Sequence, residues 1–446
     1  MSAIDAVFKA YDIRGTVPDQ LDADLCRRVG SAFAAFTGSS RIVVGRDMRP
    51  SGIELSQAFI DGVTTAGTDV VELGLASTDL LYYAAGKLDA PGAMFTASHN
   101  PAQYNGIKLC LAGARPVGEE SGLVEIKAGA VAGPGAPAAV PGTVTQQDLI
   151  DDYAAHVRTF LGDIGAARPL KIVADTANGM GGLVAPRVFA ELPFELEILF
   201  GELDGTFPNH PADPIQPANL RDLQARILET GADIGLAFDG DADRVFLVDE
   251  KAQPVSGSLT TSMVAAAMLD RSGPGPIIHN LICSKAVAEV IREHGGTPVR
   301  TRVGHSFIKQ TMAETGAVFG GEHSGHYYFR DNYRADSGLI ASMVVLGMLC
   351  AAGQPLSVFR KPFERYADSG EINSTVTDPA GVMAKIAGHF SDATIDHLDG
   401  MTVDLGDWWF NLRPSNTEPL LRLNLEAPDQ AACDAHVALV LSLIRD

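Results

Sequence analysis

Three apolar segments, widely spaced along the chain, constrain the fold more than any other feature of the sequence. Each has the apolar run of a buried strand, followed by a polar turn and a helical pattern; the segments are residues 41–47, 171–177 and 276–282. A second strand-like segment follows each of them, and these are residues 92–95, 232–238 and 316–319. The sequence therefore predicts three copies of one α/β unit, with coincidence among similar buried strands as the alternative.

The pattern changes after residue 362, where short strand-like runs are flanked on each side by a helix. These runs are residues 371–377, 401–405, 408–412 and 420–425. Because 446 residues exceed what one hydrophobic core accommodates, we predict four domains. They are α/β domains at 1–145, 146–253 and 254–362, and a smaller α+β domain at 363–446.

Three helices and one loop are also expected. The helices are residues 147–160, 258–269 and 339–352, the last of them buried. Residues 128–142 consist almost entirely of Ala, Gly, Pro and Val, which predicts an irregular surface loop near the end of the first unit.

The composition excludes several classes of partner. A formal net charge of −21 argues against nucleic acid or an anionic membrane, but not against an anionic small substrate held by a local basic cluster. Five scattered cysteines without CxxC spacing indicate reduced thiols. The N-terminal residues lack the apolar run of a secretory signal, and the longest apolar run is shorter than a membrane span of roughly 20 residues. We expect a cytoplasmic protein; the oligomeric state is not predicted.

Residues 93–101 carry the first candidate site. An apolar strand leads into Ser98 and His99 and is stopped by the Asn-Pro turn that follows, because proline fixes its own φ and restricts the residue before it. This places the Ser98 hydroxyl at the carboxyl end of a strand, where open α/β sheets hold their reactive groups. An ordinary loop is the alternative for a Ser-His pair alone.

Asp239, Asp241 and Asp243 form the second candidate site, since they alternate with small residues and can converge. Oxygen ligands of this kind suit Mg²⁺, whereas the alternative is an exposed acidic turn. Arg244 follows directly, and an arginine at this place suits a phosphate beside the metal.

Further polar groups follow later strands. Arg413 precedes three residues with hydroxyl or amide donors, which are Ser415, Asn416 and Thr417. These groups suit the binding of a phosphate, and a capped turn is the alternative. Glu322, Ser324 and His326 alternate between glycines and suit recognition of sugar hydroxyls, with a β-bulge as the alternative. His305 precedes a helix and could present donors to an anion there. Tyr11 and Arg14 are ambiguous alone.

Together these motifs resemble those of the α-D-phosphohexomutase family, and within it the phosphomannomutase/phosphoglucomutase group. The resemblance spans nearly the whole chain in the right order; the segments are residues 11–15, 96–108, 239–244, 321–326 and 413–419. It implies three similar mixed-sheet α/β domains around a central cleft and a C-terminal α+β domain like the TATA-binding protein.

The resemblance also implies roles for individual residues. Ser98 would be the phosphoserine and, with the three aspartates, would hold Mg²⁺. Glu322 and Ser324 would bind sugar hydroxyls, and the loop that begins at Arg413 would bind the non-reacting phosphate. The remaining residues implied at the reaction centre are Tyr11, Arg14, His99, Lys108, Arg244, His305 and His326. Ile282 stands where some relatives of this family carry a lysine. A phosphate contact made by that lysine therefore has no equivalent side chain at this position.

The implied activity is that of a phosphomannomutase, which interconverts mannose 6-phosphate and mannose 1-phosphate through a hexose 1,6-bisphosphate that also serves as activator. Activity on glucose phosphates is expected as well. The alternatives are a phosphoglucosamine mutase, a glucose-selective phosphoglucomutase, a serine-dependent phosphatase and a sugar-phosphate-binding regulator. Asn416 and the Glu-His-Ser order at residues 322–324 argue against the phosphoglucosamine mutase.

Overall fold

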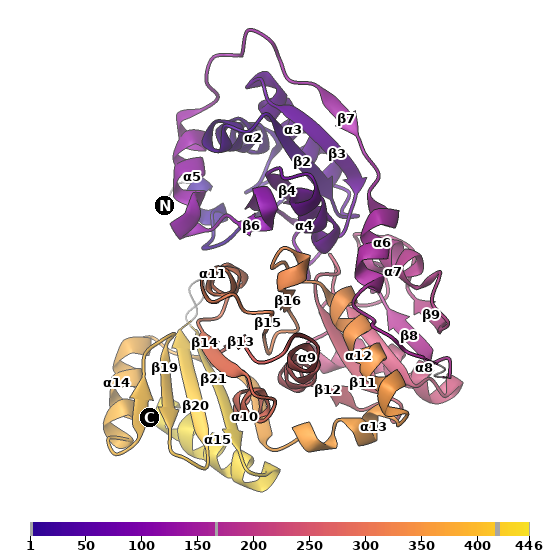
Figure 1. Ribbon diagram of the computed structural model, residues 1–446. Helices are drawn as coiled ribbons and strands as arrows, with labels where there is room; N and C mark the ends of the chain where they lie inside the picture. The colour runs from indigo at the N-terminus through magenta and orange to yellow at the C-terminus, as the bar shows by residue number, and fades with distance from the viewer. Residues whose placement is uncertain (1–2, 166–167, 415–419, 446) are drawn as a thin grey trace.

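The computed structural model describes residues 3–165, 168–414 and 420–445, and its strands form four sheets that follow one another along the chain (Figure 1). The first sheet and its helices comprise α1 (Ala3–Val7), β1 (Ile13–Thr16), α2 (Ala23–Thr37), β2 (Arg41–Arg46), α3 (Gly52–Thr65), β3 (Asp69–Leu75), α4 (Thr78–Lys87), β4 (Gly92–Phe95), β5 (Tyr104–Leu111), β6 (Arg115–Pro116), α5 (Leu123–Ala132) and β7 (Val144–Gln146).

The second and third sheets have the same kind of composition. The second group comprises α6 (Ile150–Arg158), β8 (Lys171–Asp175), α7 (Gly181–Phe189), β9 (Glu195–Leu199), α8 (Arg221–Thr230), β10 (Ile234–Phe238), β11 (Val245–Asp249) and β12 (Pro254–Val255). The third group comprises α9 (Gly257–Ser272), β13 (Pro276–Asn280), α10 (Lys285–Glu293), β14 (Thr297–Thr301), α11 (His305–Thr315), β15 (Phe319–Gly321), β16 (Tyr327–Phe329), α12 (Gly338–Ala352) and α13 (Leu356–Phe359).

The fourth sheet is entirely antiparallel, with the order β17-β21-β20-β19-β18. Its elements are β17 (Ala367–Thr375), α14 (Pro379–His389), β18 (Thr394–Asp396), β19 (Met401–Asp404), β20 (Trp409–Pro414), β21 (Leu420–Ala427) and α15 (Gln430–Arg445). This sheet has an apolar core of its own, whereas one large core runs through parts of the other three groups. The fourth domain is therefore a separate α+β unit.

The first three sheets repeat one topology, which confirms the predicted three-copy architecture. Each contains four strands in the same spatial order, namely β3-β2-β4-β5, β9-β8-β10-β11 and β14-β13-β15-β16. The first three strands of each set are parallel and the fourth is antiparallel. Parallel neighbours need long crossovers, but the third and fourth strands are joined by a short loop. These three loops contain Ser98, Asp239 and Glu322.

Some elements differ from the sequence predictions. Residues 128–142 were expected to be irregular throughout, but α5 continues to Ala132, because Ile126 and Ala130 pack into the core of the first domain. The strands β3, β9 and β14 were not predicted as members of the repeat, and β9 and β14 lie at the edges of their sheets. In β9 and β14 most residues are exposed or half-buried, so these two strands lack the apolar run that marks a central strand.

α12 is the predicted buried helix, and it contacts α6, α9 and β11. Within the described parts of the chain, no single helix is long and apolar enough to cross a membrane. Residues 338–352 and 356–363 pass that test only as a pair, and the pair is bent by 88°. All five cysteines are free thiols, as predicted.

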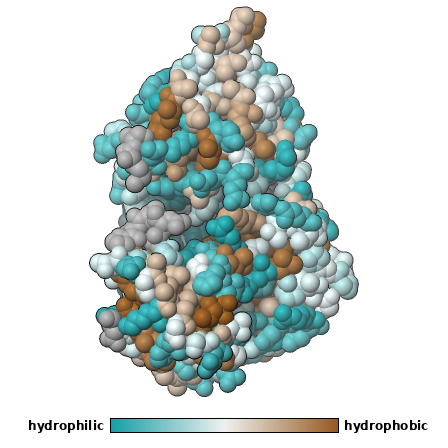
Figure 2. All heavy atoms as spheres, turned by 90° about the vertical axis from the view of Figure 1, so that its left-hand side faces the viewer, coloured by the Kyte–Doolittle hydropathy of each residue, from teal (hydrophilic) through white to brown (hydrophobic). Residues whose placement is uncertain are grey.

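A hollow separates the first domain from the third and fourth domains, which lie below it in Figure 1. Figure 2 shows it from the side, with hydrophilic residues along it. A cavity of about 670 Å³ lies between these parts and is lined by residues of the first, third and fourth domains. The domains thus enclose a polar cleft.

Candidate active site

The loops of the first and second domains bring Ser98 to the carboxylate cluster. Ser98 is buried, and its Oγ donates a hydrogen bond of 2.7 Å to Asp239 Oδ2. These residues are 141 positions apart in the chain. Gly240 permits this approach, because a Cβ there would lie 2.4 Å from the carbonyl oxygen of Ser98. The sequence predicted both groups, and the equivalence of their strand ends explains why they meet.

Arg244 links the same two loops. Its Nε donates to Asp239 Oδ2 at 2.9 Å, and its Nη2 donates to His99 Nδ1 at 2.6 Å. Burial and the charge of Arg244 lower the pKa of His99 well below its usual value, so His99 is a neutral acceptor. Arg244 therefore presents a fixed positive charge beside Ser98, whose Oγ lies 3.5 Å from Nη2.

Asp239, Asp241 and Asp243 are buried, and each offers a carboxylate oxygen within 4.8 Å of the others. Lys108 Nζ bridges two of them, at 2.7 Å from Asp241 Oδ2 and 2.6 Å from Asp243 Oδ2. Burial alone would raise the pKa of Asp241, but the charge of Lys108 holds it below its usual range. In the described part of the chain, the Oδ1 atoms of Asp241 and Asp243 are buried without a hydrogen-bond partner. Such hard oxygen donors fit a divalent cation.

The loop of the third domain contributes Glu322, Ser324 and His326. Glu322 is buried, and its carboxylate accepts hydrogen bonds from Tyr328 Oη at 2.6 Å and from Asn280 Nδ2 at 2.9 Å. His326 connects this loop to the carboxylate cluster, because its Nε2 lies 3.8 Å from Asp243 Oδ1 and its Nδ1 lies 3.2 Å from Ser324 Oγ. The predicted sugar-binding residues thus lie beside the carboxylate cluster.

The other predicted residues lie around the cleft. His305 is the first residue of α11, and its ring meets Tyr11 edge-to-face with centroids 5.1 Å apart. Arg14 Nη1 donates to Asn100 Oδ1 at 2.6 Å, next to the Ser98 loop. Tyr11 and Arg413 both line the 670 Å³ cavity, from opposite domains. The predicted phosphate-loop residues Ser415, Asn416 and Thr417 lie outside the described residues.

Sequence reasoning missed several polar residues of the site. Thr78 Oγ1 donates to Asp241 Oδ2 at 2.6 Å, and Lys309 Nζ pairs with Asp336 Oδ1 at 2.9 Å behind His326. Arg302 lines the cavity together with Arg413, Arg422, Arg115 and Arg334. A threonine at the start of a helix and single charged residues scattered over helices, strands and loops carry no local signal, so only the folded chain reveals these contacts.

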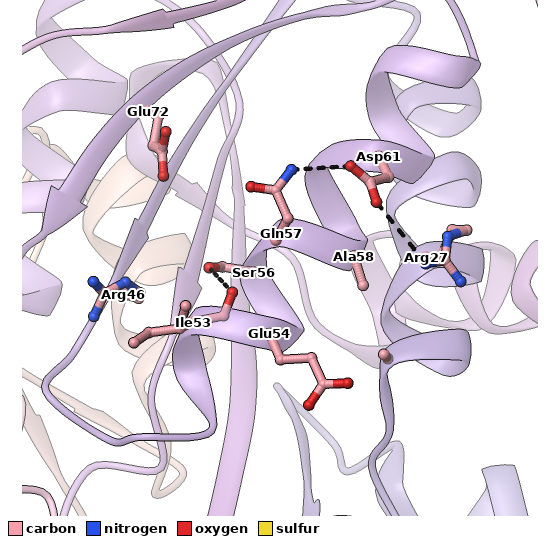
Figure 3. A pocket seen from close by; sticks show the side chains of 10 residues that line it. Arg27, Arg46, Ile53, Glu54, Ser56, Gln57, Ala58, Asp61 and Glu72 are labelled. Carbon is pink, nitrogen blue, oxygen red and sulfur yellow. Dashed lines mark hydrogen bonds and ion pairs between the residues drawn. The ribbon is translucent and has the colours of Figure 1, made fainter.

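A second hollow, with a volume of about 440 Å³, is lined by residues of α2, β2, α3 and β3 in the first domain (Figure 3). Three of its polar side chains interact with one another: Gln57 Nε2 donates to Asp61 Oδ1 at 2.9 Å, and Arg27 lies 3.9 Å from Asp61 Oδ2. The lining includes none of the predicted site residues. This hollow therefore does not belong to the candidate active site.

Comparison with known families accounts for all four domains. Models described as phosphoglucomutase/phosphomannomutase, alpha/beta/alpha domains I, II and III, match residues 5–129, 151–253 and 256–366, and the C-terminal domain model matches residues 371–441. The domain boundaries that we drew from the sequence stay a prediction. The matches and the fold define the class of protein, which is a phosphohexomutase, an enzyme that transfers a phosphoryl group.

The chain belongs to the phosphoglucomutase/phosphomannomutase family. It is 38% identical to a phosphomannomutase of Salmonella montevideo, over 98% of both chains. It is 39% identical to a protein of Xanthomonas campestris named phosphohexose mutases, over 95% of this chain and 96% of that protein. A solved family member from Burkholderia thailandensis is 34% identical and superimposes with a TM-score of 0.89, covering 100% of this chain and 98% of that one.

Proposed function

We propose that this protein interconverts mannose 6-phosphate and mannose 1-phosphate, and also accepts glucose phosphates, with Ser98 as the carrier of the phosphoryl group. One observation carries the proposal: the Ser98 hydroxyl lies 2.7 Å from Asp239, inside a buried cluster of carboxylates and cations. Relatives named phosphomannomutase and phosphomannomutase/phosphoglucomutase, 37–38% identical over 96–98% of this chain, support this choice of sugar phosphate.

Asp239, Asp241 and Asp243 would hold Mg²⁺, with an oxygen of the phosphorylated Ser98 as a fourth ligand. The unpartnered carboxylate oxygens and the lack of a thiolate ligand in the cluster support Mg²⁺ over a softer metal. Bound there, Mg²⁺ supplies positive charge against the developing charge on the transferred group. Lys108 and Arg244 add two fixed cations from the protein itself.

The transfer exchanges one oxygen–phosphorus bond for another. The free 1- or 6-hydroxyl of the sugar attacks the phosphorus, a new O–P bond forms, and the bond from phosphorus to Ser98 Oγ breaks. The proton of the attacking hydroxyl ends on the released serine oxygen, and His326, beside the carboxylate cluster, would be the base that accepts it from the sugar. The hexose 1,6-bisphosphate then turns around in the cleft and returns its other phosphoryl group to Ser98.

Substrate recognition is divided between two domains. Glu322 and Ser324 would bind the 3- and 4-hydroxyls, and Tyr328 and Asn280 hold the Glu322 carboxylate in place for this. Arg413 would bind the non-reacting phosphate across the cleft, together with the loop that follows it. Because glucose and mannose differ only at carbon 2, these contacts accept both sugars.

A coupled assay tests the proposal directly. With Mg²⁺ and a trace of glucose 1,6-bisphosphate as activator, the protein should convert mannose 1-phosphate and glucose 1-phosphate to the 6-phosphates. The two activities should lie within about 10²-fold of each other. Glucosamine 1-phosphate should react much more slowly. Release of inorganic phosphate at the rate of isomerisation would instead indicate a phosphatase.

A further inference from the structure

Arg49 is a fully buried arginine that the proposed mechanism does not use. It follows β2, and its guanidinium reaches into the loop that carries Ser98. Nη2 donates to the carbonyl oxygens of Ser98 at 2.9 Å and Asn100 at 2.6 Å. Nη1 donates to the carbonyl oxygens of Pro101 at 2.8 Å and Tyr104 at 2.9 Å. One side chain thus holds four carbonyls of the reactive loop.

Asp47 anchors this guanidinium to the sheet. Arg49 Nε donates to Asp47 Oδ2 at 3.2 Å, and the Asp47 backbone N–H donates to the carbonyl of Phe95, the last residue of β4. All five N–H donors of the guanidinium are therefore used. Lysine has only three donors around a single nitrogen and could not make the same set. The pair is shielded by the second domain, because the Phe207 ring centroid lies 5.1 Å from Arg49 Cζ.

The loop needs such support because Ser98 has an unfavourable backbone conformation. Its φ is +50°, in the left-handed region that residues other than glycine rarely occupy. Its N–H donates to Thr96 Oγ1 at 2.9 Å, and its carbonyl lies between Arg49 and Gly240 of the metal-binding loop. A strained conformation persists only where surrounding contacts fix it, and Arg49 provides the largest set of these contacts.

The same hydrogen bonds set the electrostatics of the loop. In a planar trans peptide the C=O and N–H bonds point in opposite directions. The Ser98 carbonyl points to Arg49, so the N–H of His99 in that peptide points away from it. Four carbonyl oxygens are thereby directed toward a buried cation. Their partial negative charges are kept away from a phosphoryl group on Ser98, which carries nearly two negative charges.

We propose that Arg49 is a positioning residue for phosphoryl transfer: it holds the Ser98 loop in the conformation in which Oγ accepts and donates the phosphoryl group. This inference rests on the proposed role of Ser98 and adds a residue that touches neither substrate nor metal. In the step concerned, the Ser98 Oγ–P bond forms and the P–O bond to the sugar oxygen breaks. The serine proton goes to that sugar oxygen.

The test compares Arg49→Lys with the wild type and with Arg360→Lys. Arg360 is a suitable control because it is also buried and donates to a carbonyl, that of Pro254 at 2.9 Å, outside the Ser98 loop. Dephosphorylated full-length proteins with Mg²⁺ are mixed with glucose 1,6-bisphosphate, and the rate of phosphorylation at Ser98 is followed by peptide mass. The dissociation constant of glucose 1-phosphate is measured by calorimetry.

Arg49→Lys should slow phosphorylation of Ser98, and kcat with it, by about 10²-fold, because a shift of about 1 Å in a reacting group has that effect. Its dissociation constant for glucose 1-phosphate should stay within about 2-fold of the wild type. Arg360→Lys should phosphorylate at the wild-type rate. A purely structural role for Arg49 predicts instead equal losses in binding and phosphorylation, and that result would overturn the inference.

A second variant covers the case in which Arg49→Lys does not fold. Asp47→Asn keeps the guanidinium but weakens its anchor, and it should slow phosphorylation by about 10-fold with unchanged sugar binding. A folded Asp47→Asn protein with the wild-type rate would overturn the inference. If the wild type turns over without any phosphate on Ser98, the proposed function itself fails, and this outcome is distinct from a failure of Arg49 alone.

Discussion

Replacement of Lys108 by methionine tests two roles that we propose for this lysine. One is to compensate the buried carboxylates of Asp241 and Asp243, and the other is to supply positive charge at the reaction centre. Its Nζ lies 2.7 Å from Asp241 and 2.6 Å from Asp243, and the side chain is only 9% exposed. At an effective dielectric constant of about 20, each of these attractions amounts to roughly 6 kcal/mol before desolvation is counted. Desolvation offsets most of it, and removing one partner of such a buried pair typically costs about 3–5 kcal/mol.

Methionine keeps the volume of the aliphatic stem but leaves the carboxylates without this compensating charge. In a chelator, Lys108→Met should therefore melt well below the wild type. On the proposed metal assignment, Mg²⁺ should bind the native cluster and not the unfolded chain, and it should therefore raise the melting temperature of both proteins. The rise should be larger in the variant, because there the metal ion relieves a repulsion that Lys108 otherwise relieves. kcat should fall about 10²–10³-fold, since a cation is lost from the reaction centre.

The assay is a thermal scan in EDTA and in a series of Mg²⁺ concentrations, with Lys87→Met as the control. Lys87 pairs with Asp152 at the surface, where such pairs contribute little. The control should melt like the wild type at every Mg²⁺ concentration. Equal Mg²⁺-induced rises in Lys108→Met and the wild type would refute the reasoning, because Lys108 would then not compensate the carboxylates.

Three further predictions follow from other parts of the site and core. Asp241→Asn should lower kcat far more than it raises the KM for mannose 1-phosphate, and exhaustive chelation should abolish the activity of the wild type; full activity in chelator would exclude the metal assignment. Arg302→Ala should raise the KM of the 1-phosphate and the 6-phosphate about 10-fold, as expected for one lost charged hydrogen bond, whereas Arg330→Ala, outside the cavity, should leave both unchanged. Burial lowers the pKa of His279 from 6.5 to about 4, so the contribution of its neutral form to stability is complete above pH 6.5. This contribution decreases as the pH falls, by up to about 1.4 kcal/mol per pH unit. His279→Gln should therefore make the fall of the melting temperature on the acid side shallower, and an unchanged slope would contradict this.

The repeated architecture could be predicted from sequence because its central strands carry continuous apolar runs. The loop after the third strand of each unit has the same place in the sheet, so Ser98 and Asp239 could be expected to face one cleft. The edge strands β9 and β14 escaped prediction, since one side of an edge strand faces solvent and its sequence is mixed. The prediction of an irregular loop from residue 128 was wrong for residues 128–132, which belong to α5. Packing against the core of the first domain overrides the low-complexity sequence there.

The supporting polar residues could not be predicted from a single sequence. Thr78 and Asp241 are 163 positions apart, and Arg49 contacts carbonyls about 50 residues further along the chain. Backbone carbonyls carry no residue-specific signal, so a side chain that binds them leaves no motif. Reactive groups have characteristic residue types, whereas the groups that hold them in place are recognised only through their contacts.

The central claim is that Ser98 carries the phosphoryl group. The direct measurement is intact-mass and peptide analysis of the purified protein before and after incubation with glucose 1,6-bisphosphate, with turnover followed in parallel. One phosphate on the Ser98 peptide, a dephosphorylated form that is inactive until the bisphosphate is added, and a Ser98→Ala protein that binds glucose 1-phosphate without turnover are the predicted results. Normal turnover with no phosphate on Ser98 would contradict the account.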